Sequence, residues 1–469
     1  MFRSLVATAV ALSLASTLIP STAASDTGSN TKAVILQNGL IKNIFQEWLT
    51  AFNSGSVAEI KAFYGKYLDD TNPIFALENA QDTCGFSVER FEASSATTMT
   101  VLLRQRCLQG LQRAKLELAA DGKKLKTLDF RPLALPGDGA IKATALIANR
   151  LAAQDGFAGS IIVARRSKRV FAGSWGRTNI TSRTPMSLDT PMFLASAGKM
   201  FTAVAVLQLI DAGKIDLDAP FGKYLTAYQN AEMAKVTIRQ LLNHRGGTGD
   251  IGILGRDDGA NRAWVKTAAD IVQLNGTRGP DFPPGTKEDY SNYGFILLGA
   301  VIEKVTGGSY YDYVAEHVFK PAGMNDSSFP DRDHLQNVAV GYTSYFGAEP
   351  KLVANTDSLP WRGASAGGGV STPNDMLRFL QAMREGRLLS PKMFKLATTA
   401  GATPWYGMGF VVNSGQNASW GHGGNSYGMD VAVHYYVKND TDFVCLGTRD
   451  MVCNRLIFAW FLRAFPPGQ

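Results

Sequence analysis

The sequence predicts a two-domain α+β protein, in which a small unit of helices and strands precedes a larger domain that mixes both. Three observations predict this fold class. The 469-residue chain has 45% hydrophobic and 19% charged positions, which is a globular composition. Its length suits two to three domains of about 150 residues. Helical and strand-like periodicities alternate along it, and the turn-rich stretch Leu135-Pro136-Gly137-Asp138-Gly139 separates a short first part from a long second part.

The first 24 residues have the layout of a secretory signal peptide. A basic Arg3 precedes the apolar stretch 5–18, and small residues at 22–24 provide an exit site for cleavage. The apolar stretch is shorter than the roughly 20 residues that a membrane span needs. We therefore expect residues 1–24 to be removed and residues 25–36 to form a linker. The mature protein is expected to be periplasmic or secreted, without a transmembrane segment.

Residues 37–136 are expected to form the small α+β domain. Apolar residues repeat at helical spacing over about 37–52, and Asn53-Ser54-Gly55 ends that helix. Ser56 then caps a second helix, with Glu59 completing a capping box.

Strands are expected to follow these two helices. Apolar residues alternate over 99–103 and 114–118, and Asp121-Gly122 is typical of a hairpin turn. In order and spacing, residues 37–135 resemble the α+β cone of the ketosteroid-isomerase or nuclear-transport-factor type. Such cones can hold a ligand, but this stretch shows no polar constellation for chemistry. We expect it to be a structural or gating appendage.

Residues 137–469 are expected to form the larger domain. It opens with a helix over about 140–154, and β-type runs follow at 159–164 and 170–173. The basic cluster at 164–169 lies between these runs, where a solvated hairpin turn explains it. Because the net charge of +7 is mild for this length, no nucleic-acid partner is expected.

A serine and a lysine stand at the start of an apolar helix. Residues 191–199 lead into the helix 200–212, which Gly213 closes. If the helix starts at Ser196, then Ser196 and Lys199 lie at i and i+3 with adjacent side chains. A serine hydroxyl needs a base to become a nucleophile, and a lysine kept neutral by burial can be that base.

A tyrosine and an asparagine form the second group of candidates. They lie in the loop 283–295, before a helix expected at 296–305. Tyr290 could relay a proton, and Asn292 could bind a substrate carbonyl.

A glycine-rich run forms the third group. His422, Gly423, Gly424 and Asn425 precede the strand-like stretch 430–437. Consecutive glycines let a backbone approach a ligand closely, so this edge could pair with a substrate and offer an amide to an oxyanion.

Together these motifs resemble a known superfamily. Ser-Ala-Gly-Lys at 196–199, Tyr-Ser-Asn at 290–292 and His-Gly-Gly at 422–424 look like the active-site motifs of the serine β-lactamases and penicillin-binding proteins. The resemblance covers roughly Ala140–Ala464 and is closer to the class C-like branch of esterases and D-amino-acid-specific peptidases. It implies a β-lactamase-like domain, with an antiparallel sheet flanked by helices and an all-helical lobe. The resemblance also implies that the reaction needs no metal or organic cofactor.

The resemblance also implies a role for each candidate. Ser196 becomes the acylated nucleophile, Lys199 its general base and Tyr290 a second proton-transfer group. The remaining positions would bind substrate or oxyanion: Asn292, His422, Gly423 and Gly424 for the substrate, and the backbone amides of Ser196 and Asn425 for the oxyanion.

His422 is a departure from the family pattern. It replaces the lysine of Lys-Thr-Gly, which helps to hold a substrate carboxylate, and a neutral histidine is weaker at that task. We therefore expect hydrolysis of a short acyl ester or a D-amino-acid peptide rather than a β-lactam. The alternatives are a β-lactamase or D-alanyl carboxypeptidase, and a homologue that binds a small molecule or peptide without turnover.

A rival nucleophile motif is present at Gly363-Ala364-Ser365-Ala366-Gly367. It satisfies the G-x-S-x-G pattern of α/β-hydrolases, and His422 lies downstream. That elbow needs a preceding strand and a following helix, but glycine-rich loop chemistry surrounds Ser365. We interpret this stretch as a wall of the cleft.

The cysteines fall into two local pairs, Cys84 with Cys107 and Cys445 with Cys453. In an exported protein they can form disulfides, and four buried thiols are the alternative. The histidines show no metal-ligand spacing, so no metal site is expected. The sequence does not predict an oligomeric state.

Overall fold

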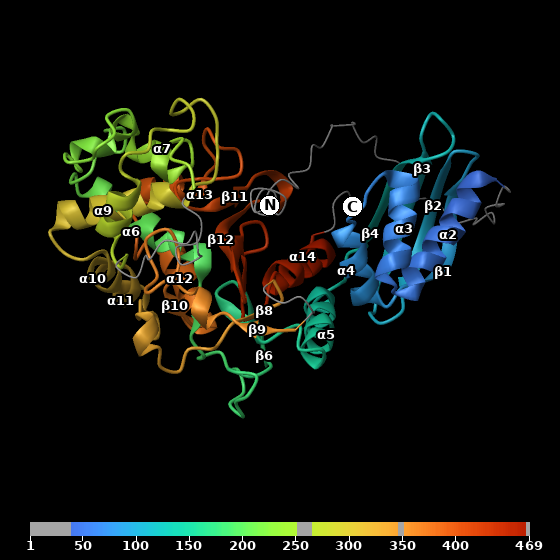
Figure 1. Ribbon diagram of the computed structural model, residues 1–469. Helices are drawn as coiled ribbons and strands as arrows, with labels where there is room; N and C mark the ends of the chain where they lie inside the picture. The colour runs from blue at the N-terminus through green and yellow to red at the C-terminus, as the bar shows by residue number, and fades with distance from the viewer. Residues whose placement is uncertain (1–38, 251–264, 346–350, 466–469) are drawn as a thin grey trace. The chain divides into compact units, whose positions relative to one another are not determined.

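A computed structural model describes residues 39–250, 265–345 and 351–465, with the elements labelled in Figure 1. The chain forms two compact units. The first runs to Ile147 and takes in residues from Phe458 onward, and the second is Ala148–Ile457. The sequence-based boundary lies earlier, after Pro136, and assigns the C-terminal residues to the second domain. The expected signal peptide and linker lie outside the described residues.

In the described residues, the first unit begins with three helices followed by an antiparallel sheet in the order β1-β2-β3-β4, and it also takes in helical residues 139–147 and the end of the C-terminal helix. The helices are α2 (Leu40–Ser54), α3 (Val57–Leu68) and α4 (Ile74–Thr83). The strands are β1 (Phe86–Ser94), β2 (Thr98–Gln105), β3 (Leu111–Leu118) and β4 (Leu125–Pro132). The two predicted strands are β2 and β3. Sequence analysis missed α4 and the strands β1 and β4. Strand β1 was missed because it is largely exposed and lacks apolar alternation.

The apolar face of α2 fills the core of this unit. Ile44, Trp48 and Phe52 are buried and pack with Val101 and Ala114 of the sheet. Such a stripe at helical spacing is what a helix needs to cover one face of a sheet.

The ends of α2 and α3 follow the predicted signals in part. Gly55 ends α2 in the left-handed region, at φ 68°. The Ser56 side chain accepts a hydrogen bond from the Glu59 N–H, which caps α3. The reciprocal half of the predicted capping box does not form, because the Ser56 N–H donates to Ser54 Oγ at 3.1 Å instead.

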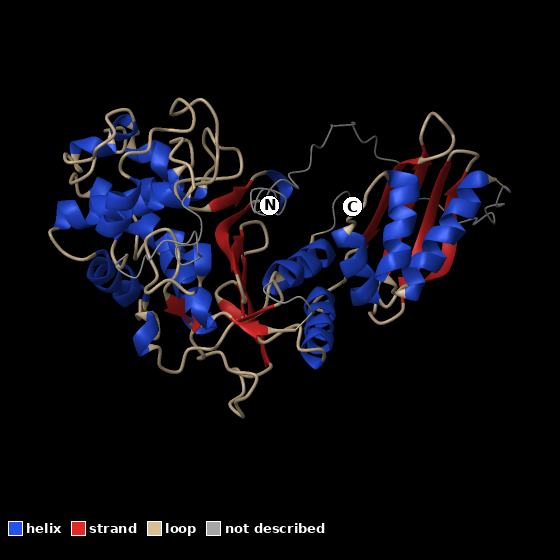
Figure 2. Ribbon diagram, in the orientation of Figure 1, coloured by secondary structure: helices blue, strands red, loops and turns tan. Residues whose placement is uncertain are grey.

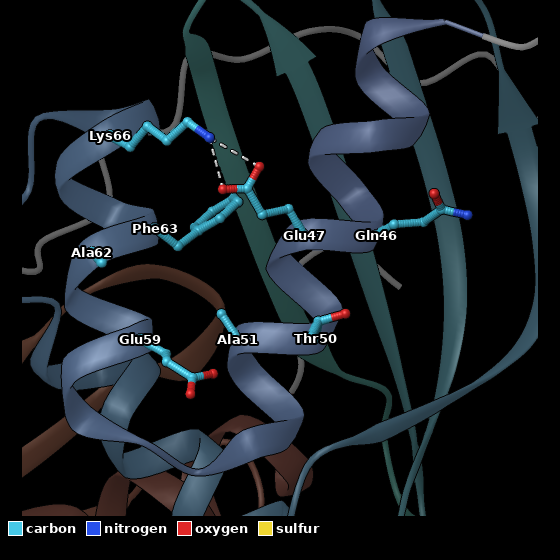
Figure 3. Close-up of a pocket in the computed structure, with 8 residues that line it drawn as sticks. All are labelled: Gln46, Glu47, Thr50, Ala51, Glu59, Ala62, Phe63 and Lys66. Carbon is cyan, nitrogen blue, oxygen red and sulfur yellow. Dashed lines mark hydrogen bonds and ion pairs between the residues drawn. The ribbon is translucent and has the colours of Figure 1, made fainter.

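A surface groove of about 440 Å³ lies between α2 and α3. Figure 3 shows its lining. Phe63 and Ala51 point into the space between the two helices, and the ion pair of Lys66 with Glu47 (2.8 Å) lies across one end. The other lining residues are Gln46, Thr50, Glu59 and Ala62. The groove is formed by helix side chains and holds no set of groups arranged for chemistry.

The second unit contains a six-stranded antiparallel sheet in the order β11-β12-β13-β14-β5-β6 among the described residues. Its strands are β5 (Gly159–Arg165), β6 (Lys168–Trp175), β11 (Val411–Asn413), β12 (Ser419–Ser426), β13 (Met429–Tyr436) and β14 (Thr441–Gly447). Short ladders pair β7 (Met192–Phe193) with β10 (Val370–Ser371), and β8 (Tyr342–Thr343) with β9 (Val353–Ala354).

Helices accompany this sheet and form a separate helical lobe (Figure 2). They are α6 (Lys199–Asp211), α7 (Ile238–Leu242), α8 (Ala268–Asn275), α9 (Asn292–Thr306), α10 (Tyr310–Val314), α11 (Lys320–Ala322), α12 (Pro373–Arg384) and α13 (Pro391–Thr398). Two further helices, α5 (Gly139–Ala153) and α14 (Val452–Ala464), are divided between the two units, after Ile147 and before Phe458. Helix α12 packs on β5, β13 and β14, whereas α6 contacts α9, α10 and α13. Because α6 is apolar on nearly every side, it lies at the centre of the core.

The structure confirms the β5–β6 hairpin, the strand β13 and, to within one residue, the helix predicted at 200–212, and it corrects one helix start. A short 3₁₀ helix, η1 (Ala195–Gly198), carries Ser196, so α6 begins only at Lys199. Helix α9 begins at Asn292, four residues before the predicted start, because the Ser291 side chain accepts a hydrogen bond from the Gly294 N–H.

The cysteines form two disulfides, one in each unit. Cys84 is joined to Cys107, and Cys445 to Cys453. In the described ranges, no helix combines the length and apolar character needed to cross a bilayer. Those ranges also contain no group of three or more histidine, cysteine or acidic side chains placed to hold a metal ion.

Candidate active site

Ser196 is presented on a tight turn between β7 and α6. Ala195 has φ 44°, a left-handed conformation that a non-glycine residue adopts at a cost, and such strain clusters at functional sites. The glycine-rich stretch holds this turn, because the Gly368 N–H donates to Ala195 O at 2.8 Å. A Cβ at Gly367 would come within 2.8 Å of Ala195 O, so only glycine permits this approach.

Lys199 is buried next to Ser196. Its Nζ lies 3.3 Å from Ser196 Oγ and 2.6 Å from Asn292 Oδ1, and it also contacts the carbonyl oxygen of Ala366. The side chain has no exposed surface, and its Nζ lies 4.8 Å from the centroid of the Tyr290 ring. Burial lowers the pKa of Lys199 to about 7, and the nearby carboxylate of Asp250 partly opposes this shift.

The contacts of Lys199 fit both protonation states: an ammonium can donate to all three oxygens, whereas the neutral amine, which the lowered pKa populates, can donate to only two of them. Such an amine has two N–H donors and one lone pair, and its contacts with Asn292 Oδ1 and Ala366 O are to groups that can only accept. These two acceptors therefore use both hydrogens. The lone pair is left for the Ser196 hydroxyl, which can then donate its proton to Nζ.

The start of α9 positions Asn292 and Tyr290. The Asn292 Nδ2 donates to Asp250 Oδ1 at 3.0 Å, which orients its Oδ1 toward Lys199. The Tyr290 hydroxyl is buried and has no hydrogen-bond partner within the described part of the chain. Burial raises the pKa of this phenol, so Tyr290 keeps its proton at neutral pH.

Strand β12 brings a backbone amide to the same place. The two-residue loop Tyr427-Gly428 closes the β12–β13 hairpin, so the end pair Ser426–Met429 exchanges main-chain hydrogen bonds and the next pair, Asn425–Asp430, does not. The Asn425 N–H therefore faces away from β13. Strand β12 contacts η1, and a Cβ at Gly424 would lie 3.1 Å from the Ser196 nitrogen. Residue 424 therefore lies against the turn that carries Ser196, one residue before Asn425.

The His422 ring, expected to bind substrate, instead contacts other groups of the protein. The side chain is 3% exposed, its Nδ1 contacts the carbonyl oxygen of Gly423, and its Nε2 lies 2.9 Å from the Tyr406 hydroxyl. Burial and the nearby Lys199 lower the pKa of His422 to about 3. His422 is therefore neutral, and both of its ring nitrogens are engaged within the protein.

Sequence analysis missed two buried side chains that complete the site. His244 is 1% exposed, its Nδ1 accepts the Ser291 N–H at 3.1 Å, and its ring lies 4.3 Å from that of Tyr290. The Tyr406 ring lies 4.5 Å from His244 and makes the hydrogen bond to His422. No local pattern marks either residue, because their neighbours come from distant parts of the chain.

Ser365 is not arranged as a nucleophile. It is 2% exposed, its hydroxyl has no hydrogen-bond partner among the described residues, and a Cβ at Gly299 would collide with it. No strand directly precedes it and no helix directly follows it in the described segment, so the nucleophile elbow is absent. The stretch instead contacts the site through its backbone, since the Ala366 carbonyl oxygen accepts from Lys199 Nζ.

The fold and this group of residues define a serine hydrolase, with a serine and a buried lysine at the start of a central helix and a sheet edge beside them. Comparison with known proteins agrees. The chain matches the Beta-lactamase family over residues 143–449 and belongs to that family.

Three relatives illustrate the match. The chain is 26% identical over 313 residues to penicillin-binding protein 4* of Bacillus subtilis, covering 63% of this chain and 68% of that protein. It is 29% identical over 277 residues to a D-aminopeptidase of Brucella anthropi, covering 57% of this chain and 51% of that protein. A crystal structure of a penicillin-binding protein from Bacillus halodurans superposes with a TM-score of 0.61 at 27% identity, covering 66% of this chain and 98% of that one. The chain therefore spans between half and about two thirds of the length of these curated relatives.

Proposed function

We propose that this protein is an exported hydrolase that forms an acyl-enzyme on Ser196 and cleaves an amide or ester, with D-amino-acid amides or peptides and short acyl esters as substrates. The observation that carries the proposal is the contact between Lys199 Nζ and Ser196 Oγ, 3.3 Å, with the other two contacts of Nζ made to pure acceptors. This arrangement leaves a neutral amine ready to take the serine proton.

Acylation begins when the Ser196 hydroxyl gives its proton to the neutral Lys199 amine as Oγ attacks the substrate carbonyl carbon. Negative charge collects on the carbonyl oxygen, where the amides of Ser196 and Asn425 can stabilise it. The C–N or C–O bond to the leaving group then breaks. Tyr290, which holds its proton at neutral pH, donates to the departing nitrogen or oxygen and is reprotonated from Lys199.

Deacylation runs the same proton transfers with water as the nucleophile. Lys199, neutral again, takes a proton from water as its oxygen attacks the ester carbonyl. The bond to Ser196 Oγ then breaks, and Oγ takes back the proton that Lys199 received from water, which leaves Lys199 neutral. The residues that activate Ser196 thus also release the product acid.

The substrate class rests on the relatives and on position 422. The D-aminopeptidase relative is named for D-amino-acid substrates, which favours an amide or peptide with a D-residue on the acyl side. A neutral, buried His422 offers no cation to a carboxylate such as penicillins carry. These two points favour the class C-like branch over a β-lactamase or a D-alanyl carboxypeptidase.

Two features outside the site belong to the same proposal. The first unit, with three helices on a four-stranded antiparallel sheet, is proposed to be a ketosteroid-isomerase-like structural or gating appendage. Export to the periplasm or medium is proposed from the signal-like residues 1–24. The two disulfides support it, because such bonds persist in oxidising compartments.

Separate substitutions of the two candidate serines test the proposal. With a panel of D-amino-acid amides, short acyl esters and penicillins, Ser196→Ala should lower kcat/KM for cleaved substrates by at least about 10³-fold. Ser365→Ala, the matched control, should retain most of the activity. A serine-reactive fluorophosphonate should add to the peptide that carries Ser196.

Activity that survives Ser196→Ala, or an adduct on Ser365, would refute the assignment of the nucleophile. Rapid hydrolysis of penicillins, with amides and esters untouched, would refute the proposed substrate class.

A further inference from the structure

His244 is a buried histidine that the proposed reaction does not use. It lies two residues after the end of α7, is 1% exposed and has a φ of 58°, in the left-handed region. Histidine enters this region more often than most residues with a side chain, but the conformation still costs free energy and persists only where surrounding contacts hold it. Such positions cluster at functional sites, so the contacts of His244 indicate what its conformation serves.

Two hydrogen bonds join His244 to the main chain on either side of Tyr290. The Asp289 N–H donates to the His244 carbonyl oxygen at 2.9 Å, and the Ser291 N–H donates to His244 Nδ1 at 3.1 Å. The carbonyl oxygen and the ring of one residue thus face the same segment. The main chain that carries Tyr290 is therefore held at both of its neighbours by His244.

The His244 ring also packs against the Tyr290 side chain. The two ring centroids lie 4.3 Å apart, and the rings of Phe295 at 5.3 Å and Tyr406 at 4.5 Å contact the same imidazole. Because protein interiors are close-packed, the imidazole cannot turn away without disturbing these neighbours. It therefore helps to fix the Tyr290 ring, whose centroid lies 4.8 Å from Lys199 Nζ.

The protonation state of His244 excludes it as a base in the reaction. Burial lowers the pKa of His244 well below its ordinary value, and the nearby Lys199 and His422 lower it further, so the ring is neutral. Since Nδ1 accepts the Ser291 N–H, the ring hydrogen is on Nε2. The one basic lone pair of the ring is thus engaged by the main chain, and His244 contributes by holding the segment around Tyr290.

We propose that His244 is a positioning residue that keeps Tyr290 where its hydroxyl can protonate the leaving group, by binding the main chain on both sides of Tyr290 and packing against its ring. This inference rests on the hydrolase function proposed above, in which Tyr290 is the proton donor. The competing explanation is that His244 only fills the core beside the site.

Two substrates with the same acyl group distinguish these explanations. D-phenylalanine 4-nitrophenyl ester releases a stable phenolate that needs no proton, whereas D-phenylalaninamide must have its nitrogen protonated to leave as ammonia. His244→Phe keeps a ring but leaves the buried Ser291 N–H without its acceptor, so the segment should shift to find another. Because a well-placed acid is worth about 10²–10⁴-fold, kcat/KM should fall at least about 10²-fold for the amide and less than about fivefold for the ester.

Two further variants show whether His244 acts through Tyr290. Tyr290→Phe removes the proton donor itself and should cause the same selective loss of amide cleavage. The double variant should then cleave the amide no more slowly than Tyr290→Phe alone, because the two changes remove one interaction. His434→Phe is the matched control, with the same substitution on β13, where the ring lies 6.5 Å from that of Tyr436. It should leave the ratio of the two kcat/KM values unchanged.

Asparagine and glutamine at position 244 test the role of the acceptor. The Oδ1 of asparagine reaches the position of Nδ1, and asparagine tolerates a left-handed φ, so His244→Asn should recover at least about tenfold of the amide activity that His244→Phe loses. The amide of glutamine extends toward the position of Nε2 instead, so His244→Gln should not recover it. His244→Gln also replaces His244→Phe if circular dichroism shows that the latter does not fold.

Equal losses for amide and ester in His244→Phe, or an asparagine variant no better than the glutamine variant, would show that His244 only fills the core and would overturn the inference. Tyr290→Phe tests the underlying function separately. If it lowers cleavage of both substrates equally, Tyr290 is not the proton donor, and that part of the proposed function fails with the inference. A selective loss in Tyr290→Phe without one in His244→Phe refutes the inference alone.

Discussion

The surroundings of Lys199 explain why its pKa is lowered. Its Nζ is surrounded by Ser196 Oγ, Asn292 Oδ1 and Ala366 O, and none of these carries a negative charge. An ammonium in this position would lack a direct counterion, which is why burial dominates its pKa. Among the causes that shift this pKa, only the negative charge of Asp250 acts against burial. Asp250 does not bond Lys199 directly but accepts a hydrogen bond from Asn292.

The first prediction follows from this residue. Because the base is the neutral amine and burial lowers its pKa to about 7, kcat/KM should rise with pH below 7 and level off above it. The rise should be tenfold per pH unit on the acid side. Measurements from pH 5 to pH 9 with an uncharged ester would record it.

Asp250→Asn provides the control for that assignment. The Asp250 carboxylate raises the pKa of Lys199, so removing its charge should move the acid limb to lower pH. Lys199→Met should lower kcat/KM by about 10²–10⁴-fold across the whole range. A flat profile, or a limb that stays in place in Asp250→Asn, would show that another group titrates.

At the scale of elements, the sequence predicts what depends on near neighbours. Ser196 and Lys199 are three residues apart, so any helical turn brings their side chains together, and the 3₁₀ start does not change that outcome. His244 and Tyr406 are missed because they meet Tyr290 and His422 only after the helical lobe and the sheet have packed. Their burial depends on contacts that no local spacing encodes.

The same distinction explains the fold of the first unit. The helix α2 is predicted because its buried residues repeat at helical spacing, whereas β1 has mostly exposed side chains and is held by its pairing with β2. Helix α4 has only a weak apolar face and follows Pro73, so it too lacks a clear pattern. Helices and strands that are stabilised mainly by neighbouring elements, and not by their own apolar pattern, are the ones that a single sequence does not predict.

The packing of β12 against η1 gives the second prediction of the Discussion. A Cβ at Gly424 would collide with the carbonyl oxygen of Leu194 and approach the Ala197 nitrogen to 3.0 Å, and backbone atoms cannot turn aside. Gly424→Ala should therefore push β12 away from η1 and separate the two amides that face the oxyanion. Loss of such a donor costs about 10²–10³-fold in kcat. Steady-state kinetics with the best amide would measure the loss.

Gly423→Ala is the comparison for this effect. Its Cβ would meet Val431 O at 3.4 Å, an ordinary contact, so a smaller loss of kcat is expected with the same substrate. Circular dichroism and thermal unfolding should show that both variants fold. If the two substitutions lower kcat equally, the contact between β12 and η1 does not control the oxyanion site.

At the scale of the whole molecule, α14 connects the two compact units. It begins in the second unit, where Cys453 is bonded to Cys445, and its residues from Phe458 onward belong to the first unit. There the Phe458 ring lies 5.6 Å from that of Phe75, and the Leu135 N–H donates to Arg463 O at 3.1 Å. A cut made after residue 136 would therefore divide the first unit.

The last prediction compares two truncated chains. Residues 137–469 keep the end of α14 but lose Phe75 and Leu135, so the Phe458 ring and the buried Arg463 should become more exposed. This chain should unfold at least about 2 °C below the full-length protein, since loss of such contacts exceeds 1 kcal/mol and each kcal/mol is worth roughly 1–2 °C at this length. It should also bind a hydrophobic dye.

The chain 148–457, cut at the limits of the second unit, should bind much less of that dye because the end of α14 is absent. Differential scanning fluorimetry without dye and a separate dye titration would measure both properties. If 137–469 unfolds at the temperature of the full chain and binds no dye, then Pro136 is the true domain boundary. The end of α14 would then be an independent part of the hydrolase, and the first unit would be dispensable for its stability.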